Sequence, residues 1–428
     1  MGVRANYQCI VRTVLSPERP MKLVHFGAGR IGRSFIGQLF SKAGWDVMFV
    51  DVDRGVVNEL NRRGQYRVVV KDEEGSVILV QNVNAIHTDD EEQVVAAVSG
   101  ADLLSTAVGK HALAAVTKPI ARGIAERHKR NPKHPIDIIL CENMKGAAGF
   151  FKEKVKEHLP AGFPVDSYVG FVETSIGKMV PLMSEEERKK DPLLVYAESY
   201  NTLIVDKHGF RGTVPDVPGI EPKAHMKAWV DRKLFIHNLG HAVLSYVSYA
   251  FFPEYRYMWQ AVSHPALHRI TKAAMWESGR ALIAEYPGEF DTSSIGVHIE
   301  DLLRRFGNRA LADTVYRVGM DLYRKLFFDD RLIGAVTLCL KHRIRPVYIS
   351  LGIAAAMCFR AVGENGRMFE RDKTFMEQEM TRGVDHTLTH VCRLEDEETR
   401  RLIKKYFDII SKMEYPVMYL DVDRLVRG

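Results

Sequence analysis

The sequence predicts an α/β protein in which a doubly wound, mostly parallel sheet comes first and an all-helical domain follows. Three observations support this fold class. Strands and helices alternate from Lys22 to about residue 205, a glycine-rich turn joins the first strand to the first helix, and the apolar pattern beyond about residue 222 is almost wholly helical. Because 428 residues exceed one typical core, we expect two domains.

The composition is that of an ordinary globular protein, with 46% apolar and 27% charged residues. The formal net charge of +6 is interspersed rather than concentrated on one segment, so we expect no nucleic-acid partner. No apolar run approaches the roughly 18 residues of a membrane span, and residues 1–20 lack the apolar core of a signal peptide. We therefore expect no membrane association, a cytoplasmic location and a dispensable extension over residues 1–20. The five cysteines, which include no CxxC motif, are expected to be reduced thiols.

The first structural unit is a strand, a glycine-rich turn, a helix and a second strand. The first strand covers residues 22–26, and the second, residues 46–50, leads into Asp51. The turn is a GxGxxG motif made of Gly27, Ala28, Gly29, Arg30, Ile31 and Gly32. This order is typical of a Rossmann-type domain, in which the glycines let the backbone approach a pyrophosphate and the acid binds the ribose hydroxyls. We predict that Asp51 favours NAD over NADP, a preference that nearby Arg54 could reverse.

The alternation of strands and helices continues to the domain boundary. A β-hairpin is expected at residues 66–70 and 76–80, and further strands at 102–108, 136–141, 167–172, 194–199 and 202–205. Ligands bind at the carboxyl ends of strands in such sheets, which places Thr106, Ala107, Val108 and residues 142–145 at the cofactor crevice. We divide the chain into an N-terminal extension (residues 1–20), an NAD-binding domain (21–210) and a helical substrate-binding domain (211–428).

The second domain is expected to be helical at about residues 222–250, 264–286, 296–306, 311–326, 330–342, 346–360, 370–382 and 396–413. A polar loop is expected at residues 363–373, and residues 418–422 have an extended pattern. The two domains should enclose a cleft, with the first of these helices as one wall.

That first helix contains the segment KLFIHNLGH, residues 233–241. An α-helix turns by about 100° per residue. Relative to Lys233, the angular positions around the helix axis are about −20° for Gly240, 40° for His237, 80° for His241 and 140° for Asn238. One face would present an amine that can act as a base, an amide that can donate to an oxyanion, and a gap at Gly240 for a ligand. The alternative is a solvated polar stripe.

A dinucleotide site beside such a face favours hydride transfer, which needs a base and donors on the oxygen where charge builds. Lys233 is the candidate base, and Asn238 and Asn143 are the candidate donors from the two domains. His241 would bind the substrate or tune the lysine. Asn143 could equally be a turn residue at the end of a strand.

Other catalytic classes have less support. The pairs His237/His241 and His264/His268 have a four-residue spacing that suits zinc, but no third ligand stands at a recognised spacing, so we predict no metal. A serine hydrolase lacks its GxSxG motif.

A basic cluster follows at residues 317–331 and contains Arg317, Arg324, Lys325 and Arg331. Arg317 and Arg324 are seven residues apart and would share one face of a continuous helix. Paired guanidinium groups suit a phosphate, so this cluster is the candidate substrate-phosphate site. The alternative is a solvated helix face.

Together these segments resemble the polyol-specific long-chain dehydrogenase family. MKLVHFGAGRIGRSFIG, STAVG, IILCENM, VDK, RKLFIHNLGH, RVG, YRKL, DRLI and GIAAAMCFR occur in the family's order between residues 21 and 412, and DRLI points to its phosphate-specific branch. The resemblance implies a zinc-independent NAD enzyme that interconverts D-mannitol 1-phosphate and D-fructose 6-phosphate. It matches the family's general base to Lys233 and its oxyanion-hole asparagines to Asn143 and Asn238.

The chain departs from the family pattern at two places. Gly177-Lys178 stands where an Asp-Arg pair is usual, and Arg309 stands where a proline is usual. The expected function is NAD-dependent oxidation of a phosphorylated hexitol, by a monomer or small homo-oligomer. Two alternatives stay open: a related dehydrogenase of free polyols or sugar acids, and a non-catalytic NAD-binding sensor.

Overall fold

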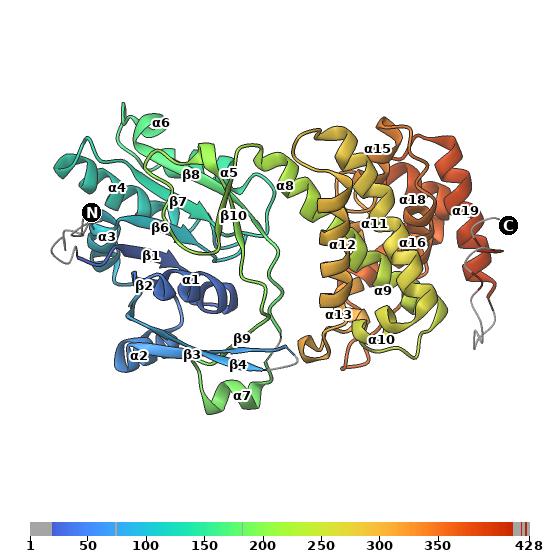
Figure 1. Ribbon diagram of the computed structural model, residues 1–428, viewed down its shortest axis with the longest axis horizontal. Coiled ribbons are helices and arrows are strands. Elements are labelled where there is room, and N and C mark those ends of the chain that lie inside the picture. The colour runs from blue at the N-terminus through green and yellow to red at the C-terminus, as the bar shows by residue number, and fades with distance from the viewer. Residues whose placement is uncertain (1–18, 73–74, 182, 414–420, 422–423, 426–428) are drawn as a thin grey trace, which may run out of the picture.

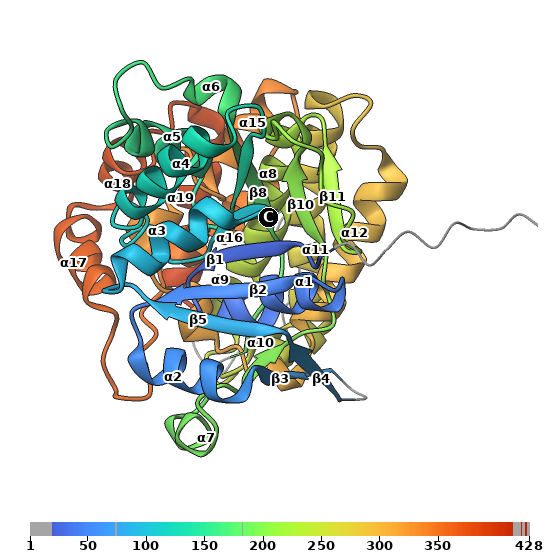
Figure 2. The same ribbon diagram turned by 90° about the vertical axis from the view of Figure 1, so that its left-hand side faces the viewer.

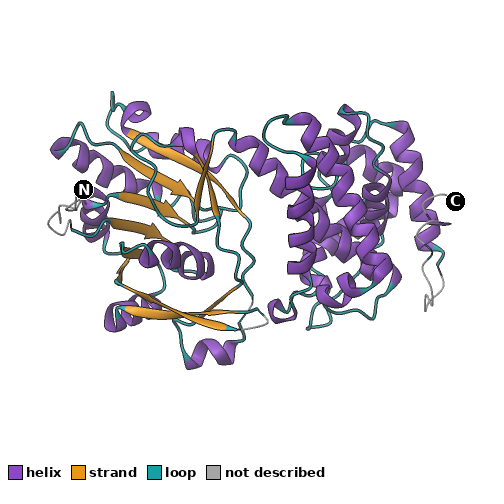
Figure 3. Cartoon of the chain, in the orientation of Figure 1, coloured by secondary structure: helices purple, strands orange, loops and turns teal. Residues whose placement is uncertain are grey.

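The computed structural model describes residues 19–72, 75–181, 183–413, 421 and 424–425. It contains a sheet domain and a helical domain, which lie side by side along the longest axis (Figure 1). This two-domain architecture confirms the predicted fold class, and Figure 3 shows that strands are confined to the first domain. Nearly all of the expected N-terminal extension, Cys9, and all but one residue of the extended segment at 418–422 lie outside the described residues.

The main sheet has eight strands in the order β11-β10-β8-β7-β6-β1-β2-β5. The strands are β1 (Lys22–Phe26), β2 (Asp46–Asp51), β5 (Val83–His87), β6 (Leu103–Thr106), β7 (Ile136–Leu140), β8 (Val169–Ile176), β10 (Leu203–Asp206) and β11 (Ile220–Lys223). From β5 to β8 every pairing is parallel, whereas β10 runs antiparallel to β8. The strand order reverses at β1, which places a ligand crevice beyond the carboxyl ends of β1 and β6.

Alternate residues of β1 enter different cores. Leu23 packs with Phe35 and Phe40 on one face of the sheet, and Val24 packs with residues of the opposite face. Strands buried on both faces are near-continuous apolar runs, and from Leu23 to Phe26 β1 is interrupted only by the buried His25, whose Nδ1 lies 2.6 Å from the Ser105 hydroxyl. In Figure 2, α3 (Glu91–Gly100), α4 (Thr117–Arg130) and α5 (Ala147–Lys156) gather on one side of the strands. The remaining helical segments of this domain are the π-helical η1 (Gly32–Gly37), which continues into α1 (Gln38–Lys42), α2 (Arg54–Arg63), α6 (Val165–Tyr168), α7 (Glu185–Lys190) and the 3-10 turn η2 (Lys207–Gly209).

The predicted hairpin is present as β3 (Gln65–Val70) and β4 (Ser76–Gln81). It forms a separate small sheet with β9 (Val195–Ala197), a strand that pairs in parallel with β3 from more than 120 residues away. The strand predicted at 194–199 is present as β9, and it belongs to this small sheet rather than to the main one. Neither β5 nor β11 was predicted, and β11 continues the main sheet to Lys223.

The helical domain surrounds α9, in which only His241 and Tyr249 are not buried. Helices α11 and α16 pack against α9, and α16 is itself buried from Ile349 to Met357. The domain comprises α8 (Met226–Arg232), α9 (Leu239–Phe251), α10 (Met258–Ser263), α11 (Pro265–Glu285), α12 (Thr292–Phe306), α13 (Val315–Gly319), α14 (Leu322–Lys325), α15 (Ile333–Lys341), α16 (Val347–Met357), α17 (Glu370–Gln378), α18 (Val384–His390) and α19 (Glu397–Ser411).

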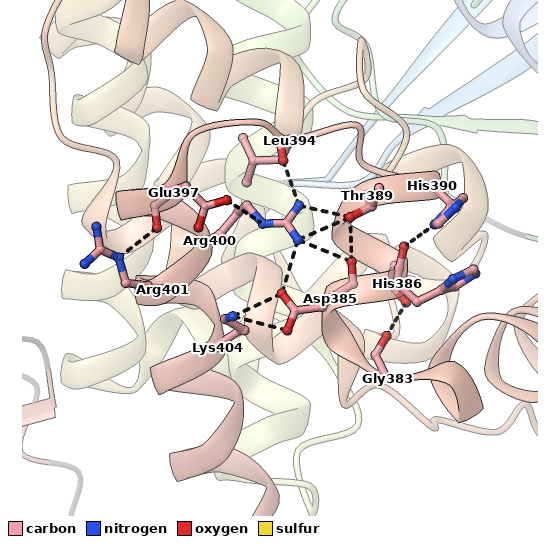
Figure 4. Close-up of polar contacts among 11 residues, drawn as sticks. Gly383, Asp385, His386, Thr389, His390, Leu394, Glu397, Arg400, Arg401 and Lys404 are labelled. Atoms are coloured by element: carbon pink, nitrogen blue, oxygen red, sulfur yellow. Dashed lines mark hydrogen bonds and ion pairs between the residues drawn. The ribbon is translucent and has the colours of Figure 1, made fainter.

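One arginine joins the last two helices of the domain (Figure 4). Arg400 of α19 donates to the Leu394 carbonyl at 2.9 Å and to the Thr389 hydroxyl at 3.2 Å, and it pairs with the Asp385 carboxylate at 3.1 Å. Arg400 thereby bonds α19 both to α18 and to the loop that connects the two helices.

Candidate active site

Three glycines shape the turn after β1. Gly27 has φ of +103°, and a Cβ there would lie 2.6 Å from the Ala107 carbonyl oxygen. A Cβ on Gly32 would lie 1.9 Å from the Gly27 carbonyl oxygen, whereas a Cβ on Gly29 would meet nothing within 4 Å. The first and third glycines are therefore required by close backbone contacts, and the second faces open space into which a phosphate fits.

A cavity of about 460 Å³ adjoins this turn. Its lining includes Gly27, Gly29, Asp51, Ala107 and Val108. The Asp51 carboxylate accepts hydrogen bonds from the backbone amides of Ala28 at 2.5 Å and Asp53 at 2.9 Å, so its position at the cavity wall is fixed. The cavity fits the adenosine half of a dinucleotide, as the motif predicts.

The other five predicted cofactor residues do not line the cavity. Ala28, Gly32 and Thr106 are buried, Arg30 is exposed, and Ile31 packs against the apolar core. Arg54 forms an ion pair of 2.7 Å with Asp89 and does not line the cavity.

Glu142 is a residue that the sequence placed at the crevice without a role. Its buried carboxylate accepts from the Thr106 hydroxyl at 2.9 Å and from the backbone amides of Val108 and Gly109 at 2.9 and 2.8 Å. Burial raises the pKa of Glu142, and these three donors oppose the rise. The carboxylate thereby ties the end of β6 and the loop after it to the end of β7.

A second cavity, of about 240 Å³, lies between the two domains. From the sheet domain it is lined by Glu142, Asn143, Met144, Lys145, Glu173, Thr174 and Ser175. From the helical domain it is lined by Val230, Lys233, Leu234, Asn238, Arg324, Asp329, Asp330 and Arg331. We call it the interdomain cleft.

Lys233 and Asn143 meet across this cleft. The Lys233 ammonium donates to the Asn143 side-chain oxygen at 2.9 Å. Burial, with a smaller contribution from the positive charge of Arg331, lowers the pKa of Lys233 from 10.5 to about 8. An amine with this pKa exists in both protonation states near neutral pH, which general acid–base chemistry requires.

The segment that carries Lys233 is not α-helical. Lys233–Asn238 forms a π-helical turn, in which the Leu239 amide binds the Leu234 carbonyl five residues back. Five residues of such a turn make about one revolution, so Asn238 returns to the side of Lys233 and lines the cleft with it. The α-helical geometry predicted a separation of roughly 140° between these two side chains, and the extra residue in the turn removes it.

The same turn directs the two histidines away from the cleft. His241 stacks on Phe306 with 4.6 Å between ring centroids, and its Nε2 lies 3.6 Å from the Asp313 carboxylate. Burial and the neighbouring cations keep the pKa of His241 well below 6.5, so the ring is neutral. Among the described residues, His241 is absent from the cleft lining, and His237 instead borders a small space behind Lys233.

The gap expected at Gly240 is filled by protein. Gly240 is buried, and a Cβ there would lie 2.6 Å from the Met275 sulfur of α11. This glycine permits close packing of α9 on α11, and the prediction that it admits a ligand is wrong.

The basic cluster is divided by a break in the helix. Residues 311–326 were expected to form one helix, but α13 ends at Gly319 and α14 begins at Leu322, with Asp321 at φ of +77° between them. Arg317 and Arg324 therefore do not share one helical face, contrary to the prediction. Arg324 lines the cleft, whereas Arg317 pairs with Asp313 and lies outside the lining.

Of the other two residues of the basic cluster, Arg331 reaches the cleft and Lys325 does not. Arg331 lines it, and its Nε donates to the Asp330 carboxylate at 2.7 Å; the Arg324 Nε donates to Asp321 at the same distance. Lys325 is buried and donates to the Val318 and Met320 carbonyls, so its ammonium does not face the cleft. The two guanidinium groups thus stand in the cleft, each oriented by its own carboxylate.

The two departures from the family pattern lie outside the cleft. Lys178 is buried and donates to the Asn201 side-chain oxygen at 2.7 Å. The guanidinium carbon of Arg309 lies 4.5 Å from the centroid of the Trp259 ring. Neither residue belongs to the cleft lining.

Two kinds of site are absent from the described part of the chain. No group of three or more histidines, cysteines or carboxylates there could hold a metal ion. No described helix combines the length and the apolar composition needed to span a bilayer.

Comparison with known proteins agrees with this geometry. The family model of the mannitol dehydrogenase Rossmann domain matches residues 21–219, and that of the mannitol dehydrogenase C-terminal domain matches residues 225–398. A D-sorbitol dehydrogenase in substrate-free form superposes with a TM-score of 0.76 at 16% identity, over 92% of this chain and 94% of that one. The mannitol 2-dehydrogenase of Pseudomonas fluorescens, solved as a ternary complex with NAD and D-mannitol, gives 0.71 at 14% identity, over 95% and 94%. The two structures share the fold, and the matched models show that the chain belongs to the mannitol dehydrogenase family of oxidoreductases.

Proposed function

We propose that the protein catalyses the reversible NAD-dependent oxidation of D-mannitol 1-phosphate to D-fructose 6-phosphate, the activity of a mannitol-1-phosphate 5-dehydrogenase. The observation that carries the proposal is the Lys233–Asn143 contact in a cleft that also contains Arg324 and Arg331. A base, an amide from each domain and two guanidinium groups are what oxidation of a phosphorylated hexitol requires.

The proton chemistry follows from the side chains of the cleft. Neutral Lys233 accepts the hydroxyl proton as the alcohol becomes a carbonyl, and its ammonium returns that proton in the reverse reaction. The Asn143 oxygen accepts from Lys233, which leaves its NH₂ group to donate to the reacting oxygen. Asn238 supplies a second amide from the helical domain. NAD, held at the glycine-rich turn and Asp51, would supply the acceptor for the hydride that leaves C5. We assign no proton-transfer step to His241, because its ring is neutral and outside the cleft lining.

The choice of NAD rests on Asp51. Its fixed carboxylate lies where a ribose hydroxyl would donate and where a 2′-phosphate would be repelled. Arg54, which could have favoured NADP, is paired with Asp89. The similar mannitol 2-dehydrogenase structure holds NAD, which supports the same choice.

The choice of a phosphorylated substrate rests on the two guanidinium groups. In Arg324 and Arg331 the Nε donates to a carboxylate. The terminal nitrogens of each guanidinium group are therefore the donors that remain for a ligand. Two terminal nitrogens of one guanidinium match two phosphate oxygens.

A spectrophotometric assay tests the proposal. NADH should be oxidised with D-fructose 6-phosphate, and NAD reduced with D-mannitol 1-phosphate. Replacing Lys233 with alanine should lower kcat roughly 10²–10⁴-fold, and Asn238→Ala should lower it about 10²–10³-fold, with NADH binding retained. Activity confined to unphosphorylated sugars would overturn the substrate assignment. Near-wild-type activity of the Lys233→Ala enzyme at neutral pH would overturn the assignment of the base.

A free polyol or a sugar acid is the second candidate substrate, and one observation favours the free polyol. The cleft is lined by four cationic side chains (Lys145, Lys233, Arg324 and Arg331) and by as many carboxylates (Glu142, Glu173, Asp329 and Asp330). A cleft with balanced formal charge is also suited to a neutral substrate. Charge reversal at Arg324 separates the candidates, because it should impair turnover of phosphorylated substrates far more than turnover of neutral ones.

A further inference from the structure

The loop between β7 and α5 is fixed at both ends. At its start, Glu142 accepts from the backbone of Val108 and Gly109. At its end, the Glu173 carboxylate accepts from the amides of Ala147 and Ala148, at 3.3 and 2.8 Å, in the first turn of α5. The three residues between them that line the cleft are Asn143, Met144 and Lys145. This loop is therefore a rigid part of the cleft wall.

Lys145 differs from the other cationic residues of the cleft in its partners. Lys233 binds Asn143, and Arg324 and Arg331 each bind a carboxylate. Among the described residues, no carboxylate lies within 4.0 Å of the Lys145 ammonium, although the lysines at 152, 154 and 156 on the following helix all have such partners. Lys145 is exposed, so its charge is available to a ligand that enters the cleft.

We propose that Lys145 binds the phosphoryl group of the substrate from the nucleotide-binding domain, opposite Arg324 and Arg331 of the helical domain. This inference rests on the proposed function and adds to it a specificity residue that the sequence did not indicate. A phosphate monoester carries a charge of about −1.5 to −2 at neutral pH. The guanidinium groups of Arg324 and Arg331 and the ammonium group of Lys145 would donate hydrogen bonds to its oxygens from opposite walls of the cleft.

The location of Lys145 links recognition to chemistry. Lys145 is two residues from Asn143, which contacts the base, and both belong to the fixed loop. A phosphoryl group held by this loop and by the helical domain holds Asn143 and Lys233 together across the cleft. Binding energy from a remote part of the substrate thus serves the reacting centre.

Substitution of Lys145 tests the proposal. The variants Lys145→Ala and Lys145→Glu are assayed with NADH against D-fructose 6-phosphate and against D-fructose, and their NADH affinity is measured by fluorescence titration. The ratio of the two kcat/KM values, phosphorylated over free, should fall about 10–100-fold, and further for glutamate than for alanine. Lys133→Glu is the matched control: it makes the same charge change in the same domain, but before β7, at the amino end of the strand rather than the carboxyl end. It should leave the ratio unchanged.

The outcomes separate this inference from the proposed function. If the wild-type enzyme reduces D-fructose 6-phosphate and Lys145→Glu keeps the wild-type ratio, the role of Lys145 is wrong and the function stands. If the wild-type enzyme reduces only the free sugar, the function is wrong, and inhibition by inorganic phosphate then reports on Lys145. Inhibition that is weakened by Lys145→Glu but not by Lys133→Glu supports the anion site. Inhibition that is unchanged in both variants, or absent from the wild-type enzyme, overturns it.

Discussion

At the scale of single residues, burial and two neighbours set the protonation of Lys233, the proposed base. Asn143 accepts a hydrogen bond from the protonated form, and Arg331 opposes that form by its charge. With burial the larger cause, the pKa of Lys233 falls to about 8. Lys233 can therefore serve as the base in oxidation and as the acid in reduction within a narrow pH range.

This pKa predicts opposite pH dependences for the two directions. Oxidation needs the neutral amine, so kcat for the polyol should rise with pH through about 8 and then level off. Reduction needs the ammonium, so kcat for the ketose should fall above about 8. In Arg331→Met a like charge is removed, so the pKa of Lys233 should rise and both midpoints should move to higher pH.

The measurement is kcat at saturating substrate from pH 6 to 10 in both directions. Arg324→Met is the control, since Arg324 lines the same cleft but is not among the charges that shift the pKa of Lys233. Equal midpoints in the wild-type and Arg331→Met enzymes would show that Arg331 does not influence the amine.

At the scale of elements, local signals predicted the parts of the site that depend on local geometry. The GxGxxG turn was recognised from the spacing of its glycines between a strand and a helix, and the close contact of Gly32 with Gly27 is local to that unit. Asn238 was expected on the same face as Lys233 and lines the cleft with it, but the π-helical turn that brings the two together has no signal in the composition of the segment. The break before Asp321 had a signal, since Gly319 stands where an α-helix commonly ends. Gly240 was misassigned because its partner, Met275, lies on another helix.

The Gly240–Met275 contact gives a prediction about helix packing. Gly240→Ala should destabilise the protein by about 1–3 kcal/mol, because the added methyl overlaps the Met275 side chain. In the double variant Gly240→Ala/Met275→Ala that overlap is removed. The two substitutions should therefore destabilise less together than the sum of their separate effects.

Chemical denaturation of the four proteins in the cycle measures this coupling. Gly149→Ala in α5 is a suitable control, because a Cβ there meets nothing within 4 Å. If the losses of free energy of unfolding in Gly240→Ala and Met275→Ala simply added in the double variant, the close approach at Gly240 would not be energetically important.

At the scale of the whole molecule, the two domains that line the cleft are also joined by buried polar contacts. Arg305 of α12 donates to both oxygens of Glu198, at 2.6 and 2.8 Å, and to the Gly177 carbonyl at 2.5 Å. The side chains of Arg305 and Glu198 are only 5% and 3% exposed. The sequence predicted two domains and a cleft between them, but not this contact, because its two residues are 107 positions apart and their pairing has no local signal. The strand order and the pairing of β9 with β3 are likewise set by distant contacts.

This ion pair leads to the last prediction. In Arg305→Met, Glu198 keeps its buried position and loses its cationic partner, which should lower the free energy of unfolding by about 3–5 kcal/mol. Arg304→Met, the adjacent substitution on the same helix, removes an exposed pair with Asp301 and should cost less than about 1 kcal/mol. In Glu198→Met/Arg305→Met no buried charge of this pair remains, so the double variant should be more stable than Arg305→Met alone. Calorimetric unfolding of the three variants checks this order. If Arg305→Met unfolded at the same temperature as Arg304→Met, the buried pair would not hold the domains together, and the alignment of Asn143 with Lys233 would depend on the remaining interdomain contacts.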